Sequence, residues 1–299
     1  MSEHQIHSLL ITHPPMSDRL RVPLMLAPAL AVILLLFAGG LVVGLGQSLD
    51  YMPIIGLRTP TFRHFVNILS DPGFRTSLLL TLSISLVSTV LATLLAVLAA
   101  LVLRHNFVGN QLVTLIFQIP LPVPHMVAAA GIVLLLTQSG LFSRLLFYLG
   151  QIQAPAQFPV LVFDRWNIAT ILVYVWKETP FIGLVVLAVL KGVGQEYEEA
   201  ARTLGANAWQ RFRYILLPLL MPGIVSTSVI VFAYTFGSFE IPLLLGQRYP
   251  AALPVTAYRA YIDPDLHQRP EAMAMGIVIT AIVVALLEVY RRYTKRSNL

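Results

Sequence analysis

Charge and cysteine are what this sequence has least of. Only 11% of its 299 residues are charged and none is a cysteine, whereas a soluble domain carries roughly 25% charged residues. The lack of cysteine excludes disulfides, a thiol nucleophile and thiolate metal sites. Because 57% of the residues are hydrophobic and the mean hydropathy is +0.77, the composition indicates a membrane protein.

The motifs of common enzymes are missing as well. There is no Gly-x-x-x-x-Gly-Lys-Ser/Thr loop, the standard backbone cradle for the phosphates of ATP. Neither His-Glu-x-x-His nor Gly-x-Ser-x-Gly occurs, so the usual hydrolytic templates are absent. His4, His7 and His13 lie in a polar tail at a spacing that specifies no coordination geometry. We therefore expect no catalytic residue, no bound cofactor and no metal site in this chain.

Long apolar segments make up most of what is present. Each is about 20 residues or longer, enough to cross a hydrocarbon core about 30 Å thick, and lipid leaves no partner for an unpaired backbone amide, so the segments must be helices. We predict an all-α polytopic membrane protein with spans at 22–46, 76–103, 111–137, 167–190, 217–245 and 271–290. A Pro-x-Pro-x-Pro run at 120–124 interrupts the third span and Pro180 the fourth, so neither should be a straight rod.

An even number of spans places both termini on one side of the membrane, and the loop charges choose the side. Eleven lysines and arginines lie in the segments 1–21, 104–110, 191–216 and 291–299. The longer segments on the opposite side, 47–75, 138–166 and 246–270, hold eight. This excess predicts that the first set is cytoplasmic. The net charge of +6 is therefore interpreted as a topology signal, and no nucleic-acid partner is expected.

The loop between the fourth and fifth spans predicts two short helices that meet at a corner. Residues 195–204 are good helix formers with acids in the first turn, where the helix dipole favours them. Glu198 precedes Arg202 by four, the spacing of a helical ion pair. Gly205 permits a bend, and Asn207 suits the N-cap of the second helix. Aromatic and basic residues follow, so an amphipathic helix lying on the membrane would explain part of this pattern.

Seven residues of this loop resemble the signature of binding-protein-dependent ABC importer permeases. The family pattern is Glu-Ala-Ala, three residues, Gly, nine residues and Ile-x-Leu-Pro. Its fixed positions are met at the right spacing by Glu199, Ala200, Ala201, Gly205, Ile215, Leu217 and Pro218. The resemblance implies that the loop is a coupling helix docking into a groove of a cytoplasmic ATPase, and an amphipathic surface helix alone would not explain seven fixed positions.

The resemblance also implies an organisation and a set of partners. It places a type I permease domain with a five-helix core at 76–290 and the coupling loop at 191–216, after a cytoplasmic tail at 1–21 and an additional first helix at 22–46, and before a basic cytoplasmic tail at 291–299. The implied partners are a cytoplasmic ABC ATPase dimer that binds the ATP and Mg, a second permease subunit that is like or related, an extracytoplasmic solute-binding protein and the lipid bilayer. The implied location is the bacterial inner membrane, and the direction of transport is import.

Two stretches, 120–131 and 237–246, resemble permeases of the polyamine, ferric iron and phosphonate group. They imply a small solute of one of these kinds. The alternatives are an ion-gradient transporter or channel, in which charges inside the spans would carry protons or ions, and a polytopic membrane enzyme. The two halves of the chain show no matching of length or of Gly and Pro interruptions, which disfavours an inverted-repeat transporter.

Ionisable residues inside the predicted spans are the candidate pathway residues. Lys177 and Glu178 fall near the middle of the fourth span, where a charge costs at least about 2.5 kcal/mol on insertion scales and should face protein or water. Adjacent helix positions point about 100° apart, so we expect them to have different partners. They line the pathway or tether helices to one another. Glu240, near the outer end of the fifth span, is either a pathway residue or an interfacial residue. His125 is either a pathway residue or a packing residue.

Overall fold

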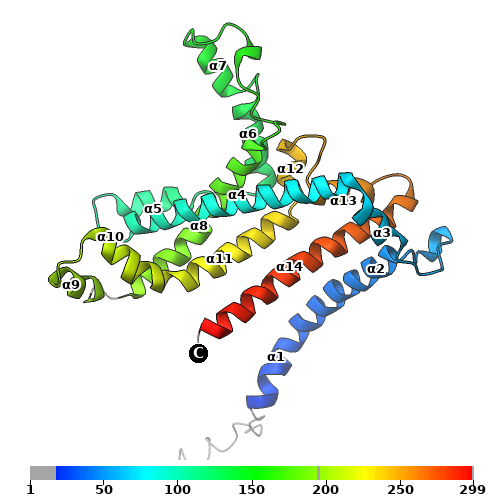
Figure 1. Ribbon diagram of the computed structural model, residues 1–299, viewed down its shortest axis with the longest axis horizontal. Helices are drawn as coiled ribbons and strands as arrows, with labels where there is room; N and C mark the ends of the chain where they lie inside the picture. Colours follow the sequence, from blue (N-terminus) through cyan, green and yellow to red (C-terminus); the bar gives the residue numbers. More distant parts are fainter. Residues whose placement is uncertain (1–17, 194–195, 298–299) are drawn as a thin grey trace, which may run out of the picture.

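The computed structural model describes residues 18–193 and 196–297, which form an elongated helical bundle (Figure 1). Most of the predicted tail 1–21, two residues of the loop at 194–195 and the last two residues of the basic tail lie outside the described residues. Across the described ranges the chain forms helices and no strand, with one isolated bridge between Met52 and Leu57. The predicted all-α fold is confirmed.

The helices follow one another without a second domain between them. They are α1 (Asp18–Ile33), α2 (Gly39–Ser48), α3 (Arg63–Ser70), α4 (Pro72–Leu103), α5 (Asn110–Gln118), α6 (His125–Leu136), α7 (Leu141–Tyr148), α8 (Ile168–Gly192), α9 (Glu196–Thr203), α10 (Ala208–Arg211), α11 (Leu217–Gly237), α12 (Glu240–Leu245), α13 (Leu253–Tyr261) and α14 (Arg269–Ser297). Short π-helical segments, η3 (Leu34–Ala38) and η6 (Phe212–Leu216), join α1 to α2 and α10 to α11.

Six helical segments are long and apolar enough to cross a membrane, as the sequence predicts. They are Val22–Ser48, Pro72–Leu103, His125–Tyr148, Ile168–Gly192, Ala208–Gly237 and Leu266–Arg292. Because six crossings return the chain to its starting side, α1 begins and α14 ends at the same side of the bundle (Figure 1).

The third span differs from its predicted bounds of 111–137. α5 ends at Gln118, turns follow, and the apolar helical segment begins only at His125. The predicted interruption is confirmed, because prolines at alternate positions remove backbone donors and restrict the residues before them. The segment then continues through α6 into α7, which extend away from the axis of α4 (Figure 1).

The fifth span ends earlier than its prediction of 217–245. α11 ends at Gly237, Ser238 adopts an extended conformation, and a separate short helix, α12, begins at Glu240. Glu240 therefore lies in the first turn of α12 and not inside the span. In the fourth span, Pro180 lies inside α8 without ending it, since a packed helix tolerates one missing backbone donor.

α4 and α8 form the centre of the bundle, and α11 packs against both. On α4 the residues Ala92, Ala96 and Ala100, four positions apart, are fully buried. Such small side chains let the backbones of neighbouring helices approach closely. Ile182 and Val186 of α8, both fully buried, fill the same cluster.

The first part of α4 is fixed by polar contacts. At its start, the Asp71 side chain accepts hydrogen bonds from the backbone amides of Gly73 and Phe74, which satisfies donors that a helix N-terminus leaves free. About two turns further, the buried Thr81 hydroxyl accepts a 2.8 Å hydrogen bond from the backbone N–H of Leu253 in α13. α4, with 32 residues, therefore links α13 at one end of the bundle to the α9 end at the other (Figure 1).

Candidate functional site

The segment Glu196–Arg211, which we call the elbow, consists of α9 and α10 meeting at a sharp corner. α9 carries three acidic residues in its first turn, where the helix dipole stabilises them. Gly205 ends α9 with φ of +82°, a conformation that costs an L-residue roughly 1–2 kcal/mol. The backbone N–H of Ala206 returns to the carbonyl oxygen of Ala201 at 2.9 Å and closes the corner. The predicted bend at Gly205 is confirmed.

α10 begins with a capping box, as the predicted N-cap at Asn207 requires. The Asn207 side chain accepts a hydrogen bond from the backbone of Gln210 at 2.9 Å, and the Gln210 side chain accepts one from the backbone of Asn207 at 2.8 Å. From there the helix continues through η6 into α11. The α10 part of the elbow is thus joined to the membrane span of α11 by continuous helix.

The seven residues of the signature occupy two parts of this segment. Glu199 and Ala200 are exposed on α9, and Ala201 is half-buried. Ile215 and Leu217 are half-buried at the junction of η6 and α11, and Pro218 follows as the second residue of α11. The signature thus combines an exposed face at the tip with a fixed connection at the base.

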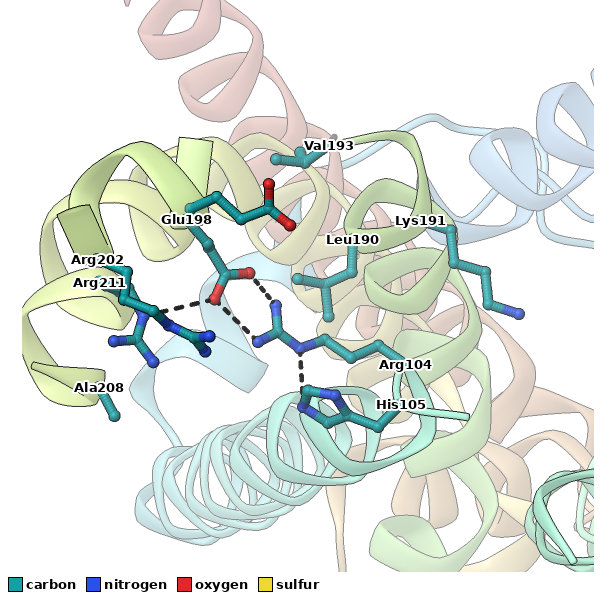
Figure 2. A pocket seen from close by; sticks show the side chains of 10 residues that line it. Arg104, His105, Leu190, Lys191, Val193, Glu198, Arg202, Ala208 and Arg211 are labelled. Carbon is teal, nitrogen blue, oxygen red and sulfur yellow. Dashed lines mark hydrogen bonds and ion pairs between the residues drawn. The ribbon is translucent and has the colours of Figure 1, made fainter. Parts of the chain in front are cut away.

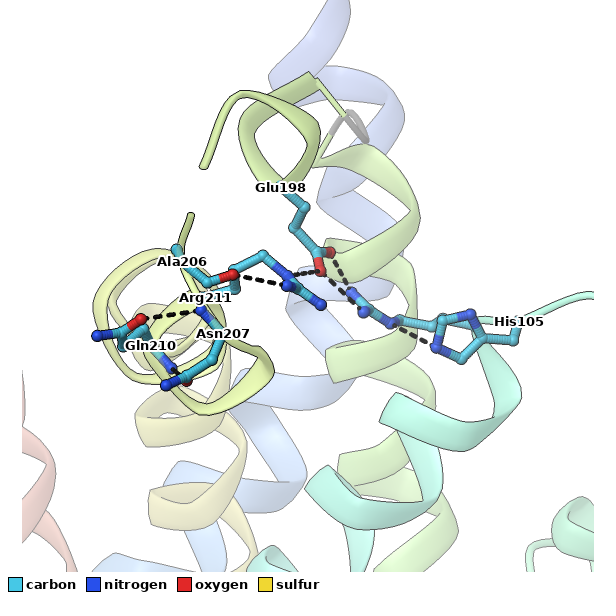
Figure 3. A network of polar contacts seen from close by, with 7 residues as sticks. His105, Glu198, Ala206, Asn207, Gln210 and Arg211 are labelled. Atoms are coloured by element: carbon cyan, nitrogen blue, oxygen red, sulfur yellow. Dashed lines mark hydrogen bonds and ion pairs between the residues drawn. The ribbon is translucent and has the colours of Figure 1, made fainter. Parts of the chain in front are cut away.

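Glu198 does not form the predicted pair with Arg202. Its carboxylate instead accepts two hydrogen bonds from the Arg104 guanidinium, at 2.5 and 3.1 Å, and lies 3.9 Å from Nε of Arg211. Figure 3 shows Arg211 reaching toward Glu198 from α10. Arg104 follows the last residue of α4, so the pair connects α9 to a helix 94 positions earlier in the chain.

These side chains line a cavity of about 590 Å³ at the α9 end of the bundle. Its lining is mainly basic, with Arg104, His105, Lys191, Arg202 and Arg211 beside Glu198 and Glu199. Figure 2 shows Lys191 directed away from the Glu198 carboxylate, whereas Arg104 and Arg211 converge on it. The hydrogen bond from Arg104 is the main cause that holds the pKa of the Glu198 carboxyl below its usual value, because it stabilises the ionised form.

Near the middle of the membrane-spanning region, three helices bring polar side chains together. Nε2 of His125, at the start of α6, lies 3.4 Å from Oε1 of Glu178 on α8. The His125 ring also packs on the ring of Tyr234 from α11, with centroids 4.9 Å apart. Glu178 is 9% exposed, so the carboxylate is shielded from lipid by these neighbours.

Lys177 has a different environment from its neighbour, as the helical geometry predicts. Its ammonium donates hydrogen bonds to the carbonyl oxygens of Pro120, Val123 and Leu121, at 2.6, 2.5 and 3.4 Å. These carbonyls belong to the proline break between α5 and α6, which leaves them without helical donors. Lys177 was predicted either to line the pathway or to tether helices to one another, and its contacts match the tether.

Glu240 lines a cavity of about 380 Å³ together with Tyr234, Gly237, Ser238 and Phe239. Tyr234 joins this cavity to the pair of His125 and Glu178, since its ring also contacts His125. The structure therefore connects His125 to Glu178 on one side and, through Tyr234, to the cavity of Glu240 on the other, while Lys177 binds the proline break instead.

The comparison with known families decides what this arrangement belongs to. Residues 92–297 match the family described as "Binding-protein-dependent transport system inner membrane component". The chain belongs to this family. It is the permease subunit of a binding-protein-dependent ABC importer, a multi-pass protein of the inner membrane.

Relatives of the permease cover nearly its whole length. The sulfate transport system permease protein CysT of Salmonella typhimurium is 26% identical over 260 residues, which are 83% of this chain and 90% of that protein. The trehalose/maltose transport system permease protein MalF of Thermococcus litoralis is 32% identical over 282 residues, 89% of this chain and 91% of the relative. Both are transport permeases. Their names refer to different solutes, sulfate for the first and trehalose or maltose for the second.

A solved structure shares the permease fold. The crystal structure of a bacterial alginate ABC transporter, in complex with an alginate pentasaccharide-bound periplasmic protein, matches 92% of this chain and 95% of its own with a TM-score of 0.75 and 23% identity. None of these three names mentions a polyamine, ferric iron or a phosphonate. The solute of this permease is therefore a matter for proposal.

Sequence reasoning missed two residues of the permease that complete these contacts. Arg104 is a single arginine in a short loop, and its partner Glu198 lies 94 positions away. Tyr234 is an aromatic residue inside an apolar span, a pattern that ordinary helix packing also produces. For Arg104 the available signal was a basic residue directly after a span. For Tyr234 it was a tyrosine four positions before Ser238. Both signals are weak.

Proposed function

We propose that the permease imports a small solute through a pathway shared with a second permease subunit, driven by a cytoplasmic ABC ATPase dimer that docks on the elbow. The observation that carries this proposal is the geometry of the elbow. An exposed Glu199-Ala200 face stands at the tip of the molecule on α9, and on the other side of the corner continuous helix runs from α10 through η6 into α11. Small side chains at this tip permit close approach, and the carboxylate can accept hydrogen bonds from a partner.

The sidedness follows from charge. The loop set that contains the elbow and both tails holds the excess of lysine and arginine, which is retained on the cytoplasmic side. Both termini are therefore cytoplasmic, and α12 and α13 face the extracytoplasmic solute-binding protein. ATP and Mg bind to the ATPase, since this chain has no phosphate loop of its own.

The mechanism is conformational coupling and not catalysis by this chain. Closure of the ATPase dimer would draw two elbows together and turn the attached spans, so that the pathway opens away from the cytoplasm. Hydrolysis would then release the elbows and reopen the pathway inward. Such coupling requires the ATPase and the solute each to contact the two states differently.

Charge reversal at the elbow tests the docking. Glu199→Lys should abolish co-purification of the importer's co-expressed ATPase with this chain, and membrane insertion should stay unchanged. Glu196→Lys is the matched control, because Glu196 is an exposed acid on the same helix but outside the signature. Equal ATPase recovery with Glu199→Lys and with the parent chain would refute the docking role.

We infer that the solute carries positive charge. Glu240 lines a cavity whose wall includes Tyr234, and Tyr234 contacts His125, the partner of Glu178, so two carboxylates lie in this region, whereas the ammonium of Lys177 is occupied by carbonyl oxygens. A dianion would be repelled by these carboxylates, whereas an amine or a metal cation would be attracted. Within the polyamine, ferric iron and phosphonate group, the charge of this wall supports the two cationic members.

Uptake by vesicles that contain the assembled importer tests this inference. A labelled diamine such as putrescine and ferric iron serve as cationic probes, and sulfate serves as the anionic comparison. Saturable uptake of a cationic probe, with a higher KM in Glu240→Gln, is the expected result. Asp263→Asn is the control, since Asp263 is an exposed carboxylate in the loop after α13. ATP-dependent uptake of sulfate and of neither cation would overturn the charge assignment.

A further inference from the structure

The contact between Arg104 and Glu198 joins the elbow to a second membrane helix. Nη1 of Arg104 donates to Oε1 of Glu198 and Nη2 donates to Oε2, the two-bond geometry that fixes orientation as well as distance. Arg211 adds a third point, since its Nε lies 3.9 Å from the same carboxylate and its NH1 donates to the carbonyl oxygen of Ala206 at 2.9 Å. Glu198 is therefore held from two sides (Figures 2 and 3).

This three-residue group is shielded enough for the charges to matter. The side chains of Arg104, Glu198 and Arg211 are 19%, 22% and 17% exposed. Fully exposed ion pairs contribute about 0–1 kcal/mol and are screened by salt, whereas a bidentate pair in a partly closed cavity is screened less. By contrast, the neighbouring Glu199 borders the same cavity but is exposed.

α4 is suited to carry movement across the bundle. It is a single helix of 32 residues that begins behind the Asp71 cap and ends at Arg104. Its central face packs on α8, and near its far end Thr81 holds the backbone of Leu253. A displacement of Arg104 therefore reaches α13 through one rigid element. The covalent routes from the elbow lead through η6 to α11 and, on its other side, to α8.

We propose that Glu198 is a positioning residue that couples the elbow to α4: the Arg104–Glu198–Arg211 group transmits movement of the docked elbow to the far end of the pathway. Glu199 contacts the ATPase, and Glu198 passes the movement on. This proposal rests on the proposed docking of an ATPase. It separates two functions within adjacent residues, since loss of Glu198 should leave docking intact and uncouple it from the pathway.

The absence of cysteine permits a direct test with a single reporter thiol. Ala260→Cys places the thiol at a half-buried position of α13, the helix that the α4 route reaches. The importer with its ATPase is purified in lipid nanodiscs, and the rate of maleimide labelling at this thiol is measured with and without a non-hydrolysable ATP analogue. Recovery of the ATPase is measured on the same samples, so that docking and coupling are read separately.

Glu198→Gln in the reporter chain should retain the ATPase but reduce the nucleotide-dependent change in labelling about five-fold or more, the lower end of typical coupling between sites. Arg104→Gln should give the same split from a different helix. Arg104→Lys, which keeps the charge without the fork, should restore part of the response. Glu196→Gln is the matched control and should behave as the reporter chain does.

Three results would overturn the proposal. The first is a full nucleotide response in Glu198→Gln, and the second is loss of ATPase recovery in Glu198→Gln, which would make it a docking residue. The third is failure of both Glu198→Gln and Arg104→Gln to fold, which would make the pair a requirement for folding. Failure of the parent reporter chain to recover any ATPase would instead refute the proposed docking on which this inference rests.

Discussion

The ammonium of Lys177 donates a hydrogen bond of 2.6 Å to the carbonyl oxygen of Pro120, which belongs to the break between α5 and α6. A buried charge is thus neutralised by backbone dipoles and not by a carboxylate. The same contact satisfies carbonyl groups that the proline run has deprived of donors. The break in the third span and the charge in the fourth therefore stabilise each other.

Removal of the Lys177 ammonium should destabilise the permease. Lys177→Met keeps the length of the side chain but leaves buried carbonyl groups unpaired, which costs about 1–3 kcal/mol. The thermal unfolding midpoint of the detergent-solubilised chain should fall accordingly. Lys191→Met, at an exposed lysine of the same helix, should leave the midpoint unchanged. Equal midpoints for the two variants would show that the carbonyls find other donors.

Backbone conformation, and not the space around the side chain, should decide which residues can substitute for Gly205. Its φ is +82°, and no other described atom lies within 4 Å of the position that a Cβ would take. Asn tolerates this left-handed region better than most residues, whereas a β-branched residue does not. Gly205→Asn should therefore retain most of the recovered ATPase, and Gly205→Val should lose it. Similar loss in both variants would indicate that the docked partner occupies the space beside Gly205.

Single thiols should report the sidedness of the loops. Asp263→Cys lies in the exposed loop after α13, and Leu204→Cys lies at the end of the elbow, where Leu204 is 87% exposed. An impermeant maleimide added to intact cells, after removal of the outer barrier, should label Asp263→Cys. It should label Leu204→Cys only after the membrane is opened. The reverse pattern would contradict the cytoplasmic placement of the elbow.

The contribution of Glu198 to stability should be lost in acid. Because Arg104 lowers its pKa in the folded state, the folded protein binds the proton less readily than the unfolded chain does. The stabilisation, about 1 kcal/mol for a partly exposed pair, is present above the ordinary carboxyl pKa of about 4.3 and fades as the pH falls through the lower folded value.

The unfolding midpoints of the parent and of Glu198→Gln should therefore differ by a constant amount between about pH 5 and pH 8, and converge below about pH 4. Glu196→Gln should follow the parent over the whole range. A difference that persisted unchanged in acid would show that Glu198 stabilises the fold by packing and not through its charge.

Local rules explain why much of the elbow and of the span pattern could be predicted. A φ of +82° suits glycine, a capping box needs Asn207 and Gln210 three positions apart, and alternate prolines interrupt a helix wherever they occur. The exact bounds were harder. His125 begins the third span and Gly237 ends the fifth because turn geometry, and not hydrophobicity, ends the neighbouring helices.

The sequence by itself determined the six apolar helices, the interruption in the third and the corner of the elbow, because each depends on residues within a few positions of one another. Only the tertiary structure decided that Glu198 binds Arg104 and not Arg202, that Lys177 binds the carbonyls of the proline break, and that His125 meets Glu178. These partners are 53 to 94 positions apart. Helix packing brings them together, and no local pattern encodes which distant helix lies alongside.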